Sequence, residues 1–260
     1  MYLSRLVLNL HNRDARRDLA DCHALHRRLL SAFPLVPTHA SGARARLGVL
    51  YRVESSCPTG APVILVQSRV APDWSRLPPG YLLRDWPGGE NPACKAVDAQ
   101  FAALRTGMRL VFRLRANPTK KIATRRDPDG PRRNGTRVEL WREADQLAWL
   151  ARKASSAGFE VLTVRARPGL SEIRGGSADQ LVVPVLAAQT ITTAKVTGQR
   201  PDRDKEGQSR TTRLTFGSVL FEGELRVVDA DRFRQALVEG IGSGKAYGFG
   251  LLSVAPARRA

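Results

Sequence analysis

Residues 108–115 read Met-Arg-Leu-Val-Phe-Arg-Leu-Arg, and the apolar side chains of Leu110, Phe112 and Leu114 recur at every second position. Successive side chains of a strand point to opposite faces of its sheet, so this spacing predicts a strand. The spacing of apolar residues predicts helices at 143–154 and 231–238 and strands at 160–167 and 249–254. It also predicts two long strands, at 181–196 and 211–228, that form a hairpin with a polar tip at 199–209. The order β-α-β-β-α-β is that of a ferredoxin-like, or RRM-like, unit.

The first half of the chain repeats this order with its second helix degenerate. The patterns predict a strand at 2–10, a helix that Asp14 or Asp18 caps and that runs to about Phe33, strands at 47–53 and 63–67, a loop rich in proline and glycine at 72–92, and a strand at 95–104. We therefore expect an α+β protein of two tandem ferredoxin-like domains, an N-terminal domain at 1–105 and a C-terminal domain at 106–260.

Charge is the strongest signal in the composition. The chain has 42 Lys and Arg against 24 Asp and Glu, a net charge of +18, while 42% of its residues are hydrophobic. So large an excess in a chain that can bury a core is typical of proteins that bind a polyanion, because basic side chains contact phosphates and release counterions. The alternative is a proteome that favours arginine throughout.

The remaining composition bears on the compartment. Cys22, Cys57 and Cys94 are odd in number and widely spaced, so they predict neither a disulfide framework nor a zinc knuckle, and we expect a reducing cytoplasm. No run approaches the ~18 apolar residues that a membrane helix needs, so no membrane partner is expected. The apolar start of the chain is short and contains Arg5, unlike a signal peptide.

All four histidines lie in the first 39 residues: His11, His23, His26 and His39. His23 and His26 are three apart on the predicted helix, so their side chains are neighbours. RNA carries its own nucleophile, the 2′-OH, and its cleavage needs a base, an acid and donors for the charge on the phosphorane. Two imidazoles with Arg27 and Arg28 beside them fit these needs without a metal or cofactor.

Two other interpretations of the histidines stay open. A histidine pair on a basic helix is often a surface accident. A zinc site of His11, Cys22, His23 and His26 is less favoured, because no third ligand stands at a recognisable spacing.

Residues 240–250, Gly-Ile-Gly-Ser-Gly-Lys-Ala-Tyr-Gly-Phe-Gly, form a glycine loop between a predicted helix and strand. The loop lacks the spacing of a Walker A or dinucleotide motif. Glycines let the backbone approach a phosphate and expose its N–H groups, so the loop fits an anion nest and a tight turn before an edge strand equally well. The candidate contacts are Gly242, Gly244, Lys245, Gly248 and Gly250.

Basic residues also cluster in the run 120–137 and along the predicted hairpin. A twisted ribbon that bears arginines can lie along an RNA stem, and with only 6% aromatic residues, recognition of a duplex by shape is favoured over stacking of many bases. The run 120–137 also fits a solvated linker, which is the usual outcome for a run of charges, so the hairpin is the more suggestive of the two. The candidate RNA-binding residues are Arg27, Arg28, Arg113, Arg115, Lys120, Lys195, Arg200, Arg210 and Arg213.

Several segments together carry a resemblance to a known family. They are Met1-Tyr2-Leu3-Ser4-Arg5, Leu25-His26-Arg27-Arg28-Leu29-Leu30 before Phe33-Pro34, Phe112-Arg113-Leu114-Arg115-Ala116-Asn117-Pro118, Glu143-Ala144-Asp145-Gln146-Leu147-Ala148-Trp149-Leu150, and Gly248-Phe249-Gly250-Leu251-Leu252-Ser253. In this order they resemble the CasE-type CRISPR repeat endoribonuclease of the Cascade complex. The pattern G-x-G, five residues, G-x-G resembles the loop of the wider repeat-associated RNA-binding superfamily.

The resemblance implies two ferredoxin-like domains and cleavage of the CRISPR repeat RNA at the base of its hairpin. The products it implies are a 5′-OH and a 2′,3′-cyclic phosphate or 3′-phosphate, and the enzyme would stay on the mature crRNA beside other Cascade subunits. It places the family's catalytic histidine on His26. Family members often have a tyrosine three residues earlier, where this chain has His23, so His23 either replaces that phenol as acid or base or only positions the RNA.

Two other functions fit the charge and the glycine loop. One is a structured-RNA-binding subunit of the same fold without catalysis, which incubation with a labelled hairpin RNA would separate from an enzyme. The other is a basic DNA-binding or ribosome-associated protein, which would show no preference for a hairpin RNA over duplex DNA at matched salt.

Overall fold

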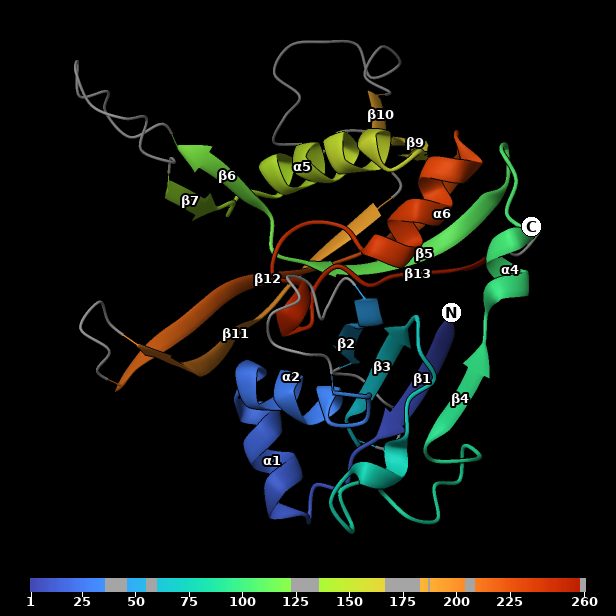
Figure 1. Cartoon of the computed structure of the whole chain (residues 1–260). Coiled ribbons are helices and arrows are strands. Elements are labelled where there is room, and N and C mark those ends of the chain that lie inside the picture. Colours follow the sequence, from blue (N-terminus) through green and yellow to red (C-terminus); the bar gives the residue numbers. More distant parts are fainter. Residues whose placement is uncertain are drawn as a thin grey trace.

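The computed structural model describes residues 1–35, 46–54, 60–122, 136–166, 183–186, 188–203 and 209–257. Outside these ranges lie His39, Cys57, residues 123–135 of the basic run and residues 204–208 of the predicted hairpin tip. The described chain forms two units, each built on an antiparallel sheet, that lie one against the other (Figure 1). No helix within these ranges is long and apolar enough to cross a membrane.

The first sheet has four strands in the order β2-β3-β1-β4. Its strands are β1 (Tyr2–Val7), β2 (Leu50–Glu54), β3 (Val63–Ser68) and β4 (Ala93–Ala96). All pairings are antiparallel, and β1 lies between β3 and β4, as the central strand of a ferredoxin-like sheet does. Between β3 and β4, where such a unit has its second helix, the chain makes only the 3-10 turn η1 (Trp74–Arg76). This confirms the degenerate second helix.

The predicted strand at 95–104 is wrong beyond Ala96. The helix α4 (Asp98–Ala102) follows β4 directly, and Phe101 donates its backbone N–H to Val97 O at 3.0 Å. Val97 and Phe101 are four residues apart, so the apolar spacing that suggests a strand also places both side chains on one face of a helix. Val97 is buried, and Phe101 packs against the second core.

The single helix predicted up to Phe33 is two helices, α1 (Arg13–Ala20) and α2 (Cys22–Leu30). Asp21 lies between them in an extended conformation, and its carboxylate accepts the backbone N–H groups of His23 at 2.8 Å and Ala24 at 3.0 Å. This is an N-cap, which ends one helix and starts the next. Asn12 caps α1, so the predicted caps were wrong.

The second sheet has the path β11-β12-β5-β13, with β8 also paired to β12. Its strands are β5 (Arg109–Ala116), β8 (Phe159–Val161), β11 (Ala188–Arg203), β12 (Ser209–Val227) and β13 (Leu252–Pro256). The helices α5 (Glu143–Ser156) and α6 (Ala230–Glu239) cover one face, and the first unit lies towards the other (Figure 1). The order repeats that of the first sheet, which confirms two ferredoxin-like units.

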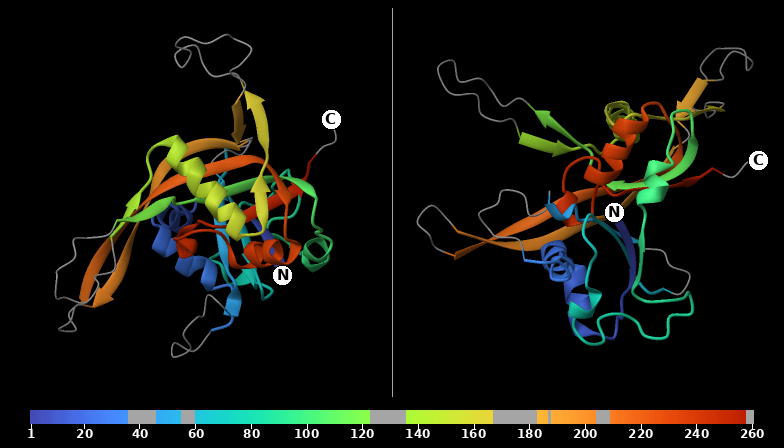
Figure 2. Two further views of the ribbon diagram at one scale, coloured as in Figure 1. Left: turned by 90° about the horizontal axis from the view of Figure 1, so that it is seen from above. Right: turned by 45° about the vertical axis from the view of Figure 1, so that its right-hand side comes forward.

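Some strand boundaries differ from the prediction. The segment 160–167 divides into β8 and β9 (Thr163–Ala166), and 181–196 into β10 (Val183–Leu186) and β11. β9 and β10 form a small separate hairpin, as do β6 (Thr119–Ile122) and β7 (Thr136–Glu139). β11 and β12 pair from Ala188 to Arg203 and project beyond the rest of the described chain (Figure 2), so the predicted long hairpin is confirmed.

A buried guanidinium connects the two sheets. Arg52 of β2 is only 2% exposed, and its Nη1 donates to Arg113 O of β5 and to Leu251 O before β13, both at 3.0 Å. Its Nε donates to Glu54 at 2.7 Å, so the charge is paired. Nearby, Gln67 of β3 donates to Leu237 O of α6 at 2.7 Å.

We predict that Arg52→Met lowers the free energy of unfolding by about 3–5 kcal/mol, because it removes the donor to both carbonyls and leaves Glu54 without its main partner. Urea denaturation measures the change. Arg109→Met is the matched control: its exposed pair with Glu224 at 3.3 Å is worth at most about 1 kcal/mol. Equal effects of the two variants would contradict a structural role for Arg52.

Candidate active site

Helix α2 presents His23 and His26 on neighbouring positions of one face. Both side chains are half-buried, while the intervening Leu25 belongs to the core of the first unit. Arg27, one position further along the helix, is exposed. The two histidines of the sequence pattern therefore lie together at the edge of the core, where packing holds them and solvent still reaches them.

The glycine loop brings a third ring to the histidines. Within it, the turn η3 (Lys245–Tyr247) lies between Gly244 and Gly248, which both have left-handed backbones with φ of 74° and 85°. The Tyr247 ring stands edge-on to His26, with 6.3 Å between ring centroids, and tilted to His23 at 6.5 Å. Sequence reasoning missed Tyr247. The signal that the sequence offered was an aromatic residue two positions after Lys245, inside a loop otherwise rich in glycine.

The loop closes on itself through its glycines. Ile241 donates its N–H to Gly250 O at 2.9 Å, and Gly250 donates to Arg115 O at 2.8 Å. The Gly250 N–H is thus engaged within the protein. Gly242 lies against the ring of Trp149, where an added Cβ would meet ring carbons at 3.0 Å. These two glycines permit close packing, and their contact with RNA stays a prediction.

The projecting hairpin touches the start of α2. The Gln199 N–H of β11 donates to the second carboxylate oxygen of Asp21 at 3.0 Å, so one side chain caps the helix and binds the hairpin. A Cβ on Gly198 would meet both Asp21 Oδ1 and Cys22 Sγ at 2.8 Å. Only glycine allows so close an approach, and it places the neighbouring Arg200 beside Tyr247.

Several predicted RNA-binding residues lie exposed around this site. Arg210 and Arg213 project from β12, and Lys120 from β6. Lys195 lies over the ring of Trp141, with its ammonium 4.9 Å from the ring centroid. Arg200 pairs with Asp202 at 3.1 Å. The structure gathers Arg200 near the histidines and distributes the others along the hairpin and the β6–β7 ribbon.

Three other predicted arginines are bound to groups of the protein itself. Arg28 Nε donates to the buried carboxylate of Asp18 at 2.7 Å. Arg115 Nε donates to Ser218 Oγ at 2.7 Å. Arg113 pairs with two carboxylates of the inter-sheet region, those of Glu54 and Glu222. A role for them in RNA binding stays a prediction.

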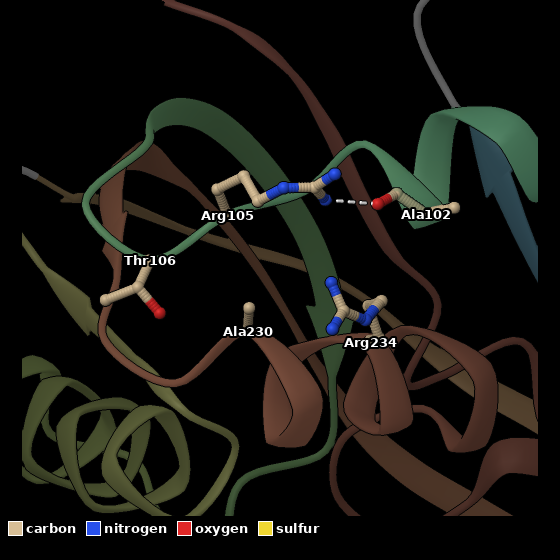
Figure 3. A pocket seen from close by; sticks show the side chains of 5 residues that line it. All are labelled: Ala102, Arg105, Thr106, Ala230 and Arg234. Carbon is tan, nitrogen blue, oxygen red and sulfur yellow. Dashed lines mark hydrogen bonds between the residues drawn. The ribbon is translucent and has the colours of Figure 1, made fainter.

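A hollow of about 880 Å³ between α4 and α6 lies apart from these residues (Figure 3). Arg105 and Arg234 line it, but both donate to Leu104 O, at 2.9 Å and 2.8 Å. None of the predicted site residues lines this hollow. Among the described residues, no group of three or more His, Cys, Asp or Glu is arranged to hold a metal ion.

Burial and the nearby charges together set the protonation of His23. Burial lowers its pKa, the carboxylate of Asp21 opposes this, and the cations Arg27 and Arg200 lower it further. The net direction is below the usual value of about 6.5. His23 is therefore mostly neutral near pH 7, the form in which an imidazole accepts a proton.

The fold and the site define a class of protein: two ferredoxin-like units in which a histidine pair faces a glycine loop. Comparison with known families identifies this class. The model of the family described as "CRISPR associated protein" matches residues 1–256, and the chain belongs to this family. The chain is 37% identical over 256 residues to the CRISPR-associated endoribonuclease Cse3 of Thermus thermophilus, covering 98% of this chain and 100% of that protein.

Two further relatives agree over the full length. The CRISPR system Cascade subunit CasE of Escherichia coli is 30% identical over 262 residues, covering 98% of this chain and 100% of that protein. Among solved structures, CRISPR endoribonuclease Cse3 bound to a 19-nucleotide RNA superposes with a TM-score of 0.66 at 35% identity, covering 98% and 100% of the two chains. The recognised family is thus confirmed.

We predict opposite shifts of the His23 pKa in two variants. Asp21→Asn keeps a good N-cap but removes the charge that raises this pKa, so the pKa falls further. Arg200→Gln removes a cation that lowers it, so the pKa rises. NMR titration of the imidazole measures both, with Asp14→Asn on α1 as the control. Shifts of the same sign in the two variants would contradict this description of the site.

Proposed function

We propose that this chain is a metal-independent endoribonuclease that binds the hairpin of CRISPR repeat RNA and cuts it at the base. The observation that carries the proposal is the convergence of His23 and His26 with the glycine loop beneath a basic hairpin. The relatives named endoribonuclease and Cascade subunit match along the whole chain, so their activity and their partners transfer to it as a unit.

The chemistry requires two proton transfers. A base removes the proton of the 2′-OH, the new bond forms between O2′ and phosphorus, and the bond from phosphorus to O5′ breaks. An acid then gives O5′ a proton, which leaves a 5′-OH and a 2′,3′-cyclic phosphate. We assign one of these transfers to His26. His23 is the candidate for the other, because it is the only second imidazole that the described residues place in the same site.

Substrate binding is assigned to the exposed cations. The A-form stem of a hairpin offers phosphates at regular spacing, and side chains cannot read its deep major groove easily. The arginines on the projecting hairpin are spaced along two paired strands, with Gln199 opposite Arg213 and Asp202 opposite Arg210. Such a ribbon contacts phosphates along a stem while the cut site lies at α2.

The proposal includes the context of the reaction. We infer that the protein stays on the mature crRNA and joins other Cascade subunits; the name of the Escherichia coli relative describes that protein as a Cascade subunit. We place it in the cytoplasm, in keeping with its unpaired cysteines Cys22 and Cys94. We keep the division into domains at 1–105 and 106–260.

We predict that His26→Ala lowers single-turnover cleavage of a repeat hairpin by about 10²-fold or more, the scale of a general acid or base, while RNA affinity stays nearly unchanged. His11→Ala, in an exposed turn, is the matched control and keeps full activity. His23→Ala and His23→Tyr complete the series: if His23 transfers a proton, tyrosine restores part of the rate that alanine loses. Full activity of His26→Ala would refute its assignment.

We predict that a 2′-deoxy nucleotide at the cut site abolishes cleavage and that EDTA does not slow it. Both follow from a nucleophile supplied by the RNA and protons supplied by side chains. Gel analysis of product ends measures the outcome. Inhibition by EDTA would rule out the metal-independent mechanism, and binding of the hairpin without any cleavage would favour a subunit that only binds RNA.

A further inference from the structure

The pentacovalent phosphorane of the reaction needs a hydrogen-bond donor near the two imidazoles, because extra negative charge develops on its non-bridging oxygens. The sequence offered Arg27 and Arg28 for this task. In the structure the Arg28 guanidinium bonds the buried Asp18 and lies over the ring of Tyr81, 5.5 Å from its centroid. One of the two expected donors is therefore engaged elsewhere.

Tyr247 lies close to both imidazoles and carries a hydroxyl that can serve as such a donor. Its ring contacts both imidazoles, which lie on one helix, from a loop about 220 residues further along the chain. Phe216 of β12 stacks on the Tyr247 ring, with 5.0 Å between the ring centroids and 26° between the ring planes. Gly244 and Gly248 fix the backbone on both sides, and the Tyr247 N–H donates to Gly244 O at 2.7 Å. The ring is thus fixed before any substrate arrives.

The hydroxyl of Tyr247 is not needed for this packing. Stacking on Phe216 and edge contacts with the histidines involve the ring alone, so phenylalanine would satisfy them. The side chain is partly exposed, and the guanidinium of Arg200 lies within hydrogen-bonding reach of its hydroxyl, whose oxygen then accepts while its proton stays available to a substrate. A phenol beside an exposed cation, at the edge of two imidazoles, lies where a phosphate would be bound.

We propose that the Tyr247 hydroxyl donates a hydrogen bond to a non-bridging oxygen of the scissile phosphate, with Arg200 beside it. This rests on the proposed cleavage of RNA. One imidazole removes the proton of the 2′-OH and the other gives a proton to O5′, while Tyr247 keeps its own proton throughout. Its contribution grows as charge moves onto the oxygen, so it acts on the rate more than on affinity.

The test compares Tyr247→Phe with Tyr2→Phe, which removes a hydroxyl from β1 outside the site. In single-turnover cleavage of a repeat hairpin, Tyr247→Phe lowers the rate on the order of 10²-fold, the scale of one lost donor, and leaves RNA affinity and the unfolding midpoint unchanged. Tyr2→Phe keeps the rate. A rate for Tyr247→Phe within twofold of the unchanged chain overturns the proposal.

A second measurement excludes an indirect role through the histidines. Sulfur replaces each non-bridging oxygen of the scissile phosphate in turn. If Tyr247 donates to one oxygen, sulfur at that position slows cleavage by the unsubstituted protein. The same sulfur lowers the already reduced rate of Tyr247→Phe only slightly further. Equal sulfur effects in both proteins overturn the proposal. If instead the unsubstituted protein does not cut the hairpin at all, the proposed function itself fails. The His26→Ala series detects that outcome separately, because it also measures cleavage by the unsubstituted protein.

Discussion

The site depends on the buried charge of Arg52. Neither ferredoxin-like unit contains the whole site: α2 belongs to the first, and the glycine loop and long hairpin belong to the second. Arg52 joins them by donating from β2 to backbone carbonyls of β5 and of the segment before β13. Burial lowers its pKa and Glu54 opposes that shift, so the guanidinium is costly to bury and stable only with all its partners. These bonds favour the relative position of the sheets in which all the partners of Arg52 are in place.

Local patterns were sufficient for the order of the sheets and for the histidine pair. The alternation at 108–115 and 2–10 reports which face of a strand is buried, and a spacing of three on a helix fixes His23 beside His26. These are properties of neighbouring residues, and the structure keeps them. The strand predicted at 95–104 failed because Val97 and Phe101 fit both periods. Phe101 packs against the core of the second unit, and this contact with distant residues favours the helix over the strand.

Features that depend on distant residues could not be predicted. Asp21 divides the first helix by capping α2, but its carboxylate also accepts a bond from Gln199, more than 170 residues away, which no local pattern shows. Tyr247 reaches the histidines only because two glycines with positive φ turn the loop towards α2. The arginines look alike in sequence, yet Arg28 and Arg115 are bound inside the protein while Arg213 is exposed. Net charge alone therefore overestimates the surface available to RNA.

Asp21 couples three properties that are usually separate. It starts α2 by capping it, binds β11 through Gln199, and raises the His23 pKa against burial and two neighbouring cations. Burial holds the imidazole neutral, as a proton acceptor requires, the cations that attract a polyanion add to this effect, and one carboxylate limits how far it goes. Because the same side chain places the hairpin, the position of the basic ribbon and the protonation of the site cannot vary independently in this chain.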